Sequence, residues 1–152
     1  MKFRMLILLI IPVFISSLQN VHAASPSKRK LEKEILEYTN QLREKKGLAP
    51  LKLVNIISDE AEDHSADMAK HRVGFGHSGF NKRFSILRKK IPGSFLMAEN
   101  VAYGPRSGRD VVNLWKRSPQ HRKNMLGNYK YIGIGIATNS SGVPYYTQIF
   151  IR

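Results

Sequence analysis

Residues 132–137, with the sequence IGIGIA, decide the fold class of this chain. Three isoleucines alternate with two glycines and an alanine, so a strand here has one apolar face and one face that another element can approach closely. A turn-forming stretch over 139–142 (NSSG) and a second apolar run over 143–151 follow directly. The sequence therefore predicts an antiparallel hairpin at the C-terminal end.

Helices are predicted before this hairpin, because apolar residues recur there at spacings of three and four. Two shorter helical segments are expected later, one capped by Ser107 and one that begins at Ser118 with Pro119 in its first turn. The three longer predicted helices come earlier in the chain and cover residues 31–46, about 54–72 and 80–91. Helices before and between strands indicate an α+β fold with helices packed on a small, mainly antiparallel sheet.

The apolar side of the second predicted helix includes His64 and His71. A histidine on such a face is usually a partly buried, hydrogen-bonded side chain rather than a ligand. For His71, near the C-terminal end of the helix, we also expect a favourable interaction with the helix dipole.

The N-terminal segment has the pattern of a secretory signal peptide. Lys2 and Arg4 precede an apolar run over 5–14, and small residues at 21 and 23 allow cleavage before Ala24. The run is shorter than the roughly 20 residues that a membrane-spanning helix needs, so no transmembrane span is expected after cleavage. The predicted organisation is a signal peptide over 1–23, a disordered N-terminus over 24–30 and one domain over 31–152, located outside the cell or in the periplasm.

Charge and cysteine content limit the chemistry of this domain. The chain of 152 residues contains no cysteine and has a formal net charge of +14, which becomes +12 once Lys2 and Arg4 leave with the signal peptide. Thiolate nucleophiles and cysteine-ligated metals are therefore excluded. The positive charge favours an anionic polymer or lipid surface as a partner, with no sequence-specific nucleic-acid recognition.

The stretch 74–79 (GFGHSG) matches a dinucleotide-binding pattern, but the context is wrong. That pattern must leave a buried strand and open a long helix, whereas here a polar amphipathic helix precedes the glycines. We interpret the glycines as an irregular turn that brings His77 inward.

A set of short motifs, each weak alone, is jointly specific in order and spacing. They are AxxHSxDM at 61–68, His77-Ser78, Ala98-Glu99-Asn100, Trp115, SPQHRKNML at 118–126, IGIG at 132–135 and YYTQIF at 145–150. Through these motifs, residues 31–150 resemble the CAP superfamily, the SCP-like extracellular domain of cysteine-rich secretory, venom antigen and plant pathogenesis-related proteins. The resemblance is strongest to the disulfide-free bacterial branch.

The resemblance implies an α-β-α sandwich with a central cleft, where eukaryotic members place two histidines and two glutamates that can hold a divalent cation. His77 and Glu99 match the first histidine and the first glutamate. Ser118 and Tyr145 stand at the two other positions, so half of the set is lost, and both are expected to line the cleft. His121 belongs to the pattern of the bacterial branch and is expected to turn into the same cleft.

His77, Glu99 and His121 are therefore the candidate metal ligands. Two neutral imidazoles and one carboxylate suit a divalent cation such as zinc, with one position left for water. Alternatively, Glu99 fixes the histidine tautomers by hydrogen bonding, which gives a polar cluster without a metal. The sequence leaves both open, and it assigns no catalytic residue, because Ser78 directly beside His77 is not the pairing that a catalytic triad requires.

Three functions remain at this point. The first is a secreted module that binds an extracellular partner or an apolar ligand through a polar His/Glu cleft, without obligatory catalysis. The second is a metal-dependent, protease-like hydrolase that uses His77, Glu99 and His121. The third is a basic binder of an anionic cell-wall polymer or lipid. The absence of a complete catalytic set favours the first.

We expect cleavage before Ala24 and release of the domain from the cytoplasm, because the charged, apolar and small-residue regions follow one another as in a signal peptide. N-terminal sequencing of the exported protein tests this. Recovery of the chain with Met1 intact in a membrane fraction would indicate a retained anchor instead.

Overall fold

The computed structural model describes residues 26–152, and the predicted signal peptide lies outside the described residues. Among residues 26–152, no helix is both long and apolar enough to span a bilayer. The elements follow in this order: α1 (Pro26–Glu44), β1 (Lys52–Leu53), α2 (Asn55–Ala69), α3 (Phe80–Lys90), β2 (Met97–Tyr103), α4 (Gly108–Arg117), α5 (Pro119–Met125), β3 (Tyr131–Thr138) and β4 (Pro144–Ile151).

The predicted hairpin is present as β3 and β4, which form the centre of a four-stranded sheet in the order β1-β3-β4-β2. β1 pairs with β3 in parallel, and the other two pairings are antiparallel. β2 therefore lies beside β4, with Glu99 opposite Ile149. This register places the glutamate near the middle of the strand.

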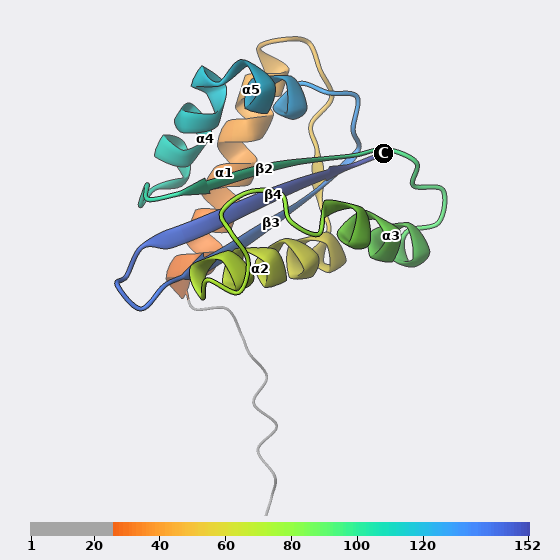
Figure 1. The fold of residues 1–152 in the computed structure, drawn as a ribbon. Coiled ribbons are helices and arrows are strands. Elements are labelled where there is room, and N and C mark those ends of the chain that lie inside the picture. The colour runs from red at the N-terminus through yellow and green to blue at the C-terminus, as the bar shows by residue number, and fades with distance from the viewer. Residues whose placement is uncertain (1–25) are drawn as a thin grey trace, which may run out of the picture.

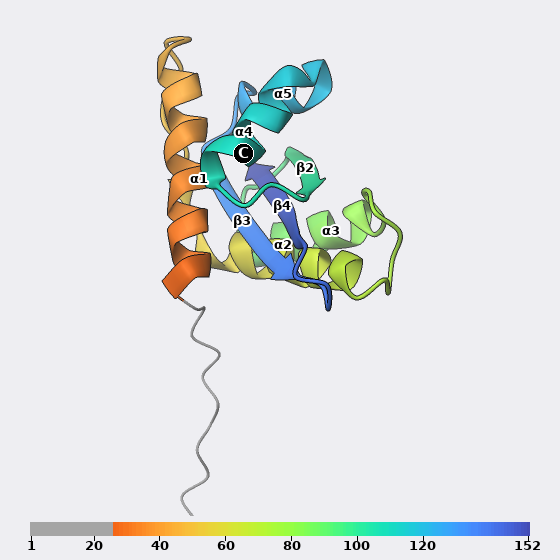
Figure 2. The same ribbon diagram turned by 90° about the vertical axis from the view of Figure 1, so that its left-hand side faces the viewer.

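Helices cover both faces of the sheet (Figures 1 and 2). α1, α4 and α5 lie on one face, and α2 and α3 lie on the other. The first face is packed by a large apolar cluster that includes Trp115, whose fully buried indole Nε1 donates to the carbonyl oxygen of Val101 at 3.1 Å. A separate apolar cluster joins α2 and α3 to the sheet. The predicted α+β sandwich is confirmed.

Glycines in β3 bring α2 unusually close to the sheet. A Cβ atom at Gly133 would overlap with backbone atoms of Ile57 and Ser58, and a Cβ at Gly135 would overlap with those of Ala61 and Glu62. The alternate residues of this strand point to the other face and join its apolar cluster. The close approach predicted for the glycine face is therefore seen. α2 thus fills the space on the glycine face of β3.

The start of α1 differs from the prediction. Residues 24–30 were expected to be disordered, but the helix begins at Pro26 and includes Lys30. Proline is well accepted in the first turn of a helix, because its missing N–H would have no partner there. Lys28 also forms an ion pair with Glu62 of α2, which holds this end of α1 against the second layer.

Gly135→Ala should lower the free energy of unfolding by about 1–3 kcal/mol or more, because the added methyl group meets backbone rather than a movable side chain. Gly74→Ala is the matched control, since nothing lies within 4 Å of a Cβ there, and it should change stability by less than about 0.5 kcal/mol. Urea unfolding of both variants measures the difference. Equal midpoints would mean that α2 can move away from β3 at little cost.

Candidate functional site

Glu99 is the centre of the candidate site. It lies in β2, and its side chain has no solvent exposure. An ionised carboxylate in such a place is strongly unfavourable unless charged and hydrogen-bonding groups surround it. The neighbours of Glu99 therefore show what the site is built to do.

Arg83 of α3 is the main partner of this carboxylate. Its Nε donates to Glu99 Oε2 at 2.8 Å, and its Nη2 donates to Oε1 at 2.8 Å. Two parallel charge-assisted bonds of this kind hold a carboxylate in a fixed plane. Nη1 also donates to the carbonyl oxygen of Ser78 at 2.7 Å. Arg83 is only 8% exposed, so this ion pair is an interior one.

His77 reaches the same carboxylate from the loop before α3. Its Nδ1 lies 2.9 Å from Glu99 Oε1, and its side chain is 50% exposed. Because a carboxylate oxygen only accepts hydrogen bonds, Nδ1 carries the proton, and Nε2 is left free of this bond. Gly76 and Gly79, with φ angles of 145° and 77°, allow the loop to turn inward as predicted.

His64 also belongs to this group, although the sequence predicted only a buried structural histidine. It is 3% exposed, and its Nε2 lies 2.8 Å from the carbonyl oxygen of Gly76 and 3.8 Å from Glu99 Oε1. Burial lowers the pKa of His64, the bond to Gly76 opposes this shift, and the nearby charge of Arg83 lowers the pKa further. The prediction for His71 is wrong, because α2 ends at Ala69 and His71 is exposed with a φ of 55°.

His121 lies across an open cavity of about 360 Å³ from His77. Burial and the neighbouring His77 lower the pKa of His121. The cavity is lined by residues of the α3 side, of β2 and of α5: His77, Phe80, Met97, Ala98, Glu99, Gln120, His121 and Asn124. The structure thus brings the three candidate ligands His77, Glu99 and His121 to one cavity.

A polar network fixes α5 against β2 and so positions His121. Asn100 Nδ2 donates to the carbonyl oxygen of His121 at 3.1 Å and lies 3.2 Å from Gln148 Oε1. Asn124 Nδ2 donates to the carbonyl oxygen of Glu99 at 3.1 Å and to Asn100 Oδ1 at 2.9 Å. Thr39 of α1 completes the network by accepting from Gln148 at 2.9 Å. The position of His121 therefore depends on buried amides that tie α5 to the sheet.

Arg43 of α1 holds the other end of α5. Its Nη1 donates to the carbonyl oxygens of Met125 and Gly127, both at 2.8 Å. Arginine suits this place because the last carbonyl groups of a helix lack partners within the helix. The wall of the cavity formed by α5 is thus held at both ends.

Ser118 and Tyr145 do not line this cavity, in contrast to the prediction. Ser118 is the residue between α4 and α5, and it caps α5 by position without a side-chain hydrogen bond. Tyr145 lies near the start of β4, four residues before Ile149, which is opposite Glu99 in the sheet. Its ring stacks on Tyr103 with centroids 5.6 Å apart. Phe75 covers this pair edge-on, so Tyr145 forms part of an aromatic cluster away from His121.

The residues of the site do not fit a divalent cation. Among residues 26–152, no group of three or more His, Asp or Glu side chains is arranged to hold a metal ion. In addition, Arg83 donates to both carboxylate oxygens of Glu99, so the carboxylate is already engaged by a cation. The alternative in which Glu99 fixes a histidine by hydrogen bonding agrees with the distances.

Comparison with known proteins assigns this chain to a family. The family model for the cysteine-rich secretory protein family (CAP) matches residues 36–150. The chain belongs to the CAP family. The uncharacterized protein YkwD of Bacillus subtilis (strain 168) is 33% identical over 136 residues, which are 87% of this chain and 51% of YkwD. The chain spans about half or less of the length of the curated relatives it matches.

Solved structures support the same assignment of this CAP domain. An extracellular protein from Bacillus anthracis with an SCP domain is 28% identical with a TM-score of 0.68, over 86% of this chain and 44% of that protein. An outer surface protein from Borrelia burgdorferi has a TM-score of 0.66 at 20% identity, over 79% and 90% of the two chains. The second likeness concerns the fold alone.

The free energy of unfolding should fall as the pH drops below about 6.5, because the pKa of His64 is lowered in the folded state and the unfolded chain therefore binds the proton more readily. The stabilisation that results from this difference in pKa is complete at pH 7.5 and is lost progressively as the pH falls toward 5. His64→Gln keeps a donor for the carbonyl of Gly76 but does not titrate, so its stability should fall less over this range. Urea unfolding at three pH values measures this.

His71→Gln is the control for this experiment, because it removes an exposed histidine and should leave the pH dependence of the wild type unchanged. If the free energy of unfolding of His64→Gln varies with pH as that of the wild type does, the pKa of His64 does not differ between the folded and unfolded states, and the prediction is wrong.

Proposed function

We propose that this CAP domain is a secreted binding module that holds an anionic cell-wall polymer along the cleft between α3 and α5, without chemistry on the ligand. One observation carries the proposal: the carboxylate at the bottom of the cavity is already neutralised by Arg83. The polar side chains that remain available in the cavity are imidazoles and amides, which can hydrogen-bond a ligand, and no hydroxyl, thiol or amine lies beside them among the lining residues. The extracellular relative from Bacillus anthracis supports the location.

The lining of the cavity argues against the hydrolase alternative. Covalent catalysis of hydrolysis most often uses an activated hydroxyl, thiol, amine or carboxylate. The described residues around this cavity supply no hydroxyl, thiol or amine, and Glu99 is committed to Arg83. The same ion pair removes the carboxylate that a metal-dependent hydrolase would use, so the cavity favours binding over hydrolysis.

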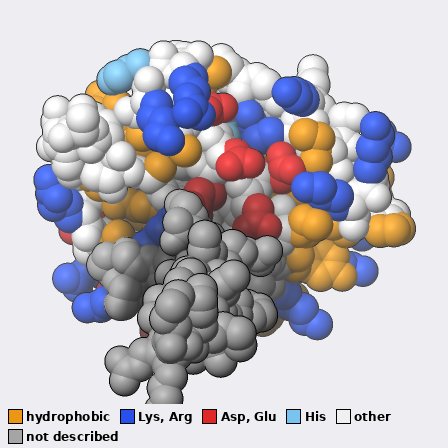
Figure 3. All heavy atoms as spheres, turned by 90° about the horizontal axis from the view of Figure 1, so that it is seen from below, with side chains coloured by type: hydrophobic (Ala, Val, Ile, Leu, Met, Phe, Trp, Pro, Cys, Tyr) orange, Lys and Arg blue, Asp and Glu red, His pale blue; other side chains and the backbone are white. Residues whose placement is uncertain are grey.

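Charge distribution supports an anionic ligand. From residue 68 to the end of the sequence, the only acidic residues are Glu99 and Asp110. Beside the cavity, the last turn of α5 carries Arg122 and Lys123, which directly follow the lining residue His121. Acidic residues are instead concentrated in α2, which contains Asp59, Glu60, Glu62, Asp63 and Asp67. Figure 3, the view from below, shows acidic side chains gathered on that face of the molecule. A polyanion thus meets the least repulsion along the cleft.

The paired substitution Arg122→Gln/Lys123→Gln should weaken binding to soluble polyphosphate by about tenfold or more, because two exposed charges beside the cavity are removed. The dependence of affinity on salt should also become less steep. Lys45→Gln/Lys46→Gln is the matched control, since it removes the same charge from an exposed turn after α1. Fluorescence anisotropy at several salt concentrations measures both.

Equal losses in the two double variants would show that net charge alone attracts the polymer, and would contradict binding in the cleft. Vesicles with an anionic phospholipid serve as a second probe. If they retain the protein and polyphosphate does not, the partner is a lipid surface and the polymer proposal fails.

A further inference from the structure

We propose that the guanidinium group of Arg83 is the resident cation of this cleft and takes the position beside Glu99 that a divalent metal would otherwise occupy. Both bonds from Arg83 to the carboxylate are 2.8 Å long, and the ion pair is closed to solvent. Arginine keeps its charge at every pH at which the protein is folded. The inference does not rest on the polymer proposed above, because it concerns only the groups around Glu99.

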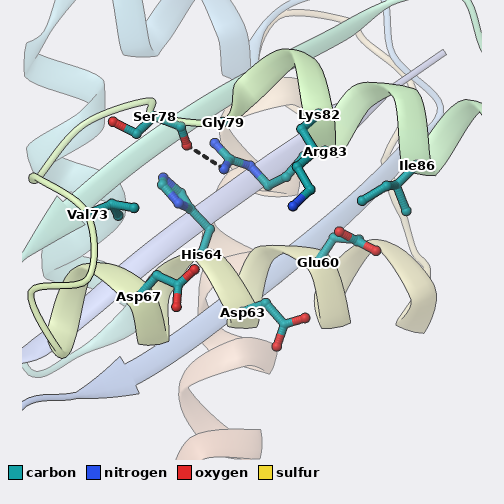
Figure 4. A pocket seen from close by; sticks show the side chains of 10 residues that line it. All are labelled: Glu60, Asp63, His64, Asp67, Val73, Ser78, Gly79, Lys82, Arg83 and Ile86. Carbon is teal, nitrogen blue, oxygen red and sulfur yellow. Dashed lines mark hydrogen bonds between the residues drawn. The ribbon is translucent and has the colours of Figure 1, made fainter.

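The shape of the loop before α3 is adapted to this cation. Arg83 Nη1 lies 2.7 Å from the carbonyl oxygen of Ser78, and Figure 4 shows this bond at the edge of the pocket between α2 and α3. A Cβ at Gly79 would lie only 3.3 Å from the same nitrogen, and Gly79 has a φ of 77°. A glycine at this position thus allows the guanidinium to approach the loop. One side chain neutralises Glu99 and also positions the segment that carries His77.

The other groups near Glu99 are arranged for a cation that is already present. His77 gives a hydrogen bond to Oε1, so this nitrogen is a donor and not a metal ligand. His64 and Arg83 approach each other from α2 and α3 (Figure 4), and the nearby positive charge disfavours protonation of the imidazole. A second cation at this point would face the guanidinium directly. The repulsion would act in a largely dehydrated site, where it is strong.

Removal of Arg83 should therefore change the chemistry of the site, and not only its stability. Without the guanidinium, the Glu99 carboxylate remains with His77 at 2.9 Å and His64 at 3.8 Å from Oε1. Two imidazoles and one carboxylate form a donor set that zinc accepts. Loss of arginine should thus create a metal site that the wild-type protein lacks.

The test compares Arg83→Met with the wild type by titration with Zn²⁺ and by the visible absorption of Co²⁺ at about pH 7.5. Arg83→Met keeps an unbranched apolar stem and removes the guanidinium group, and it should bind one equivalent of metal. Adding Glu99→Gln to this variant should abolish the binding. Lys82→Met is the matched control, because it removes the same charge from the adjacent residue of α3, which forms no bond to Glu99. The wild type and the control should show no stoichiometric binding.

Two outcomes would overturn the inference. One is stoichiometric Zn²⁺ binding by the wild type that is lost on His77→Ala. The other is a folded Arg83→Met variant, with the circular dichroism of the wild type, that binds no metal. If Arg83→Met does not fold, NMR of the wild type decides. The Nε–H signal of Arg83 should persist unchanged in excess Zn²⁺, and its displacement together with the His77 ring signals would contradict the proposal.

Discussion

The negative charge of Glu99 inside the protein is the constraint on which the arrangement of the cleft depends. A buried carboxylate requires a counter-charge and hydrogen-bond donors from whatever elements lie next to it. Here Arg83 comes from α3, His77 from the loop before α3 and His64 from α2. Side chains from α2, from α3 and from the loop between them therefore meet at one strand, and His121 of α5 lines the cavity that opens beside His77 and Glu99.

The close approach of α2 to the sheet makes this meeting possible. Gly133 and Gly135 remove the side chains that would otherwise separate β3 from α2, so the helix lies directly against the strand backbone. Ser65 of α2 uses this proximity to donate to the carbonyl oxygen of Gly135 at 3.0 Å. One turn before Met68, His64 then reaches Glu99, although β4 lies between β3 and β2 in the sheet order. A wider gap at β3 would withdraw His64 from the carboxylate.

Much of the fold follows from local patterns in the sequence. The alternation over 132–137 predicted both the hairpin and the close packing of its glycine face, and apolar spacing predicted the helices within a few residues of their observed ends. The start of α1 was missed because Pro26–Lys30 has no apolar stripe, and the ion pair of Lys28 joins it to Glu62 in a different helix. Patterns within a segment do not report such contacts between layers.

The candidate site was predicted only in part, for the same physical reason. His77, Glu99 and His121 do meet at one cavity, whereas Arg83 was not among the predicted site residues. A signal was present: Arg83 lies three residues after Phe80 and four before Leu87, so it falls on the apolar stripe of its own helix. A charge on a buried stripe must have a buried partner. Glu99 is the one charged residue of β2, so it was the acidic residue to consider as the partner of Arg83.

The energetics of the Arg83–Glu99 pair explain why it points to function rather than to stability. Removing one member of a buried pair costs about 3–5 kcal/mol, but replacing both members by well-packed apolar residues is often neutral or stabilising. A stable core at this position therefore does not require either charge. The pair does provide a fixed carboxylate plane, from which His77 takes its tautomer and the loop at Ser78 takes its position. Those are properties of a binding cleft, and an apolar pair at the same positions would supply neither.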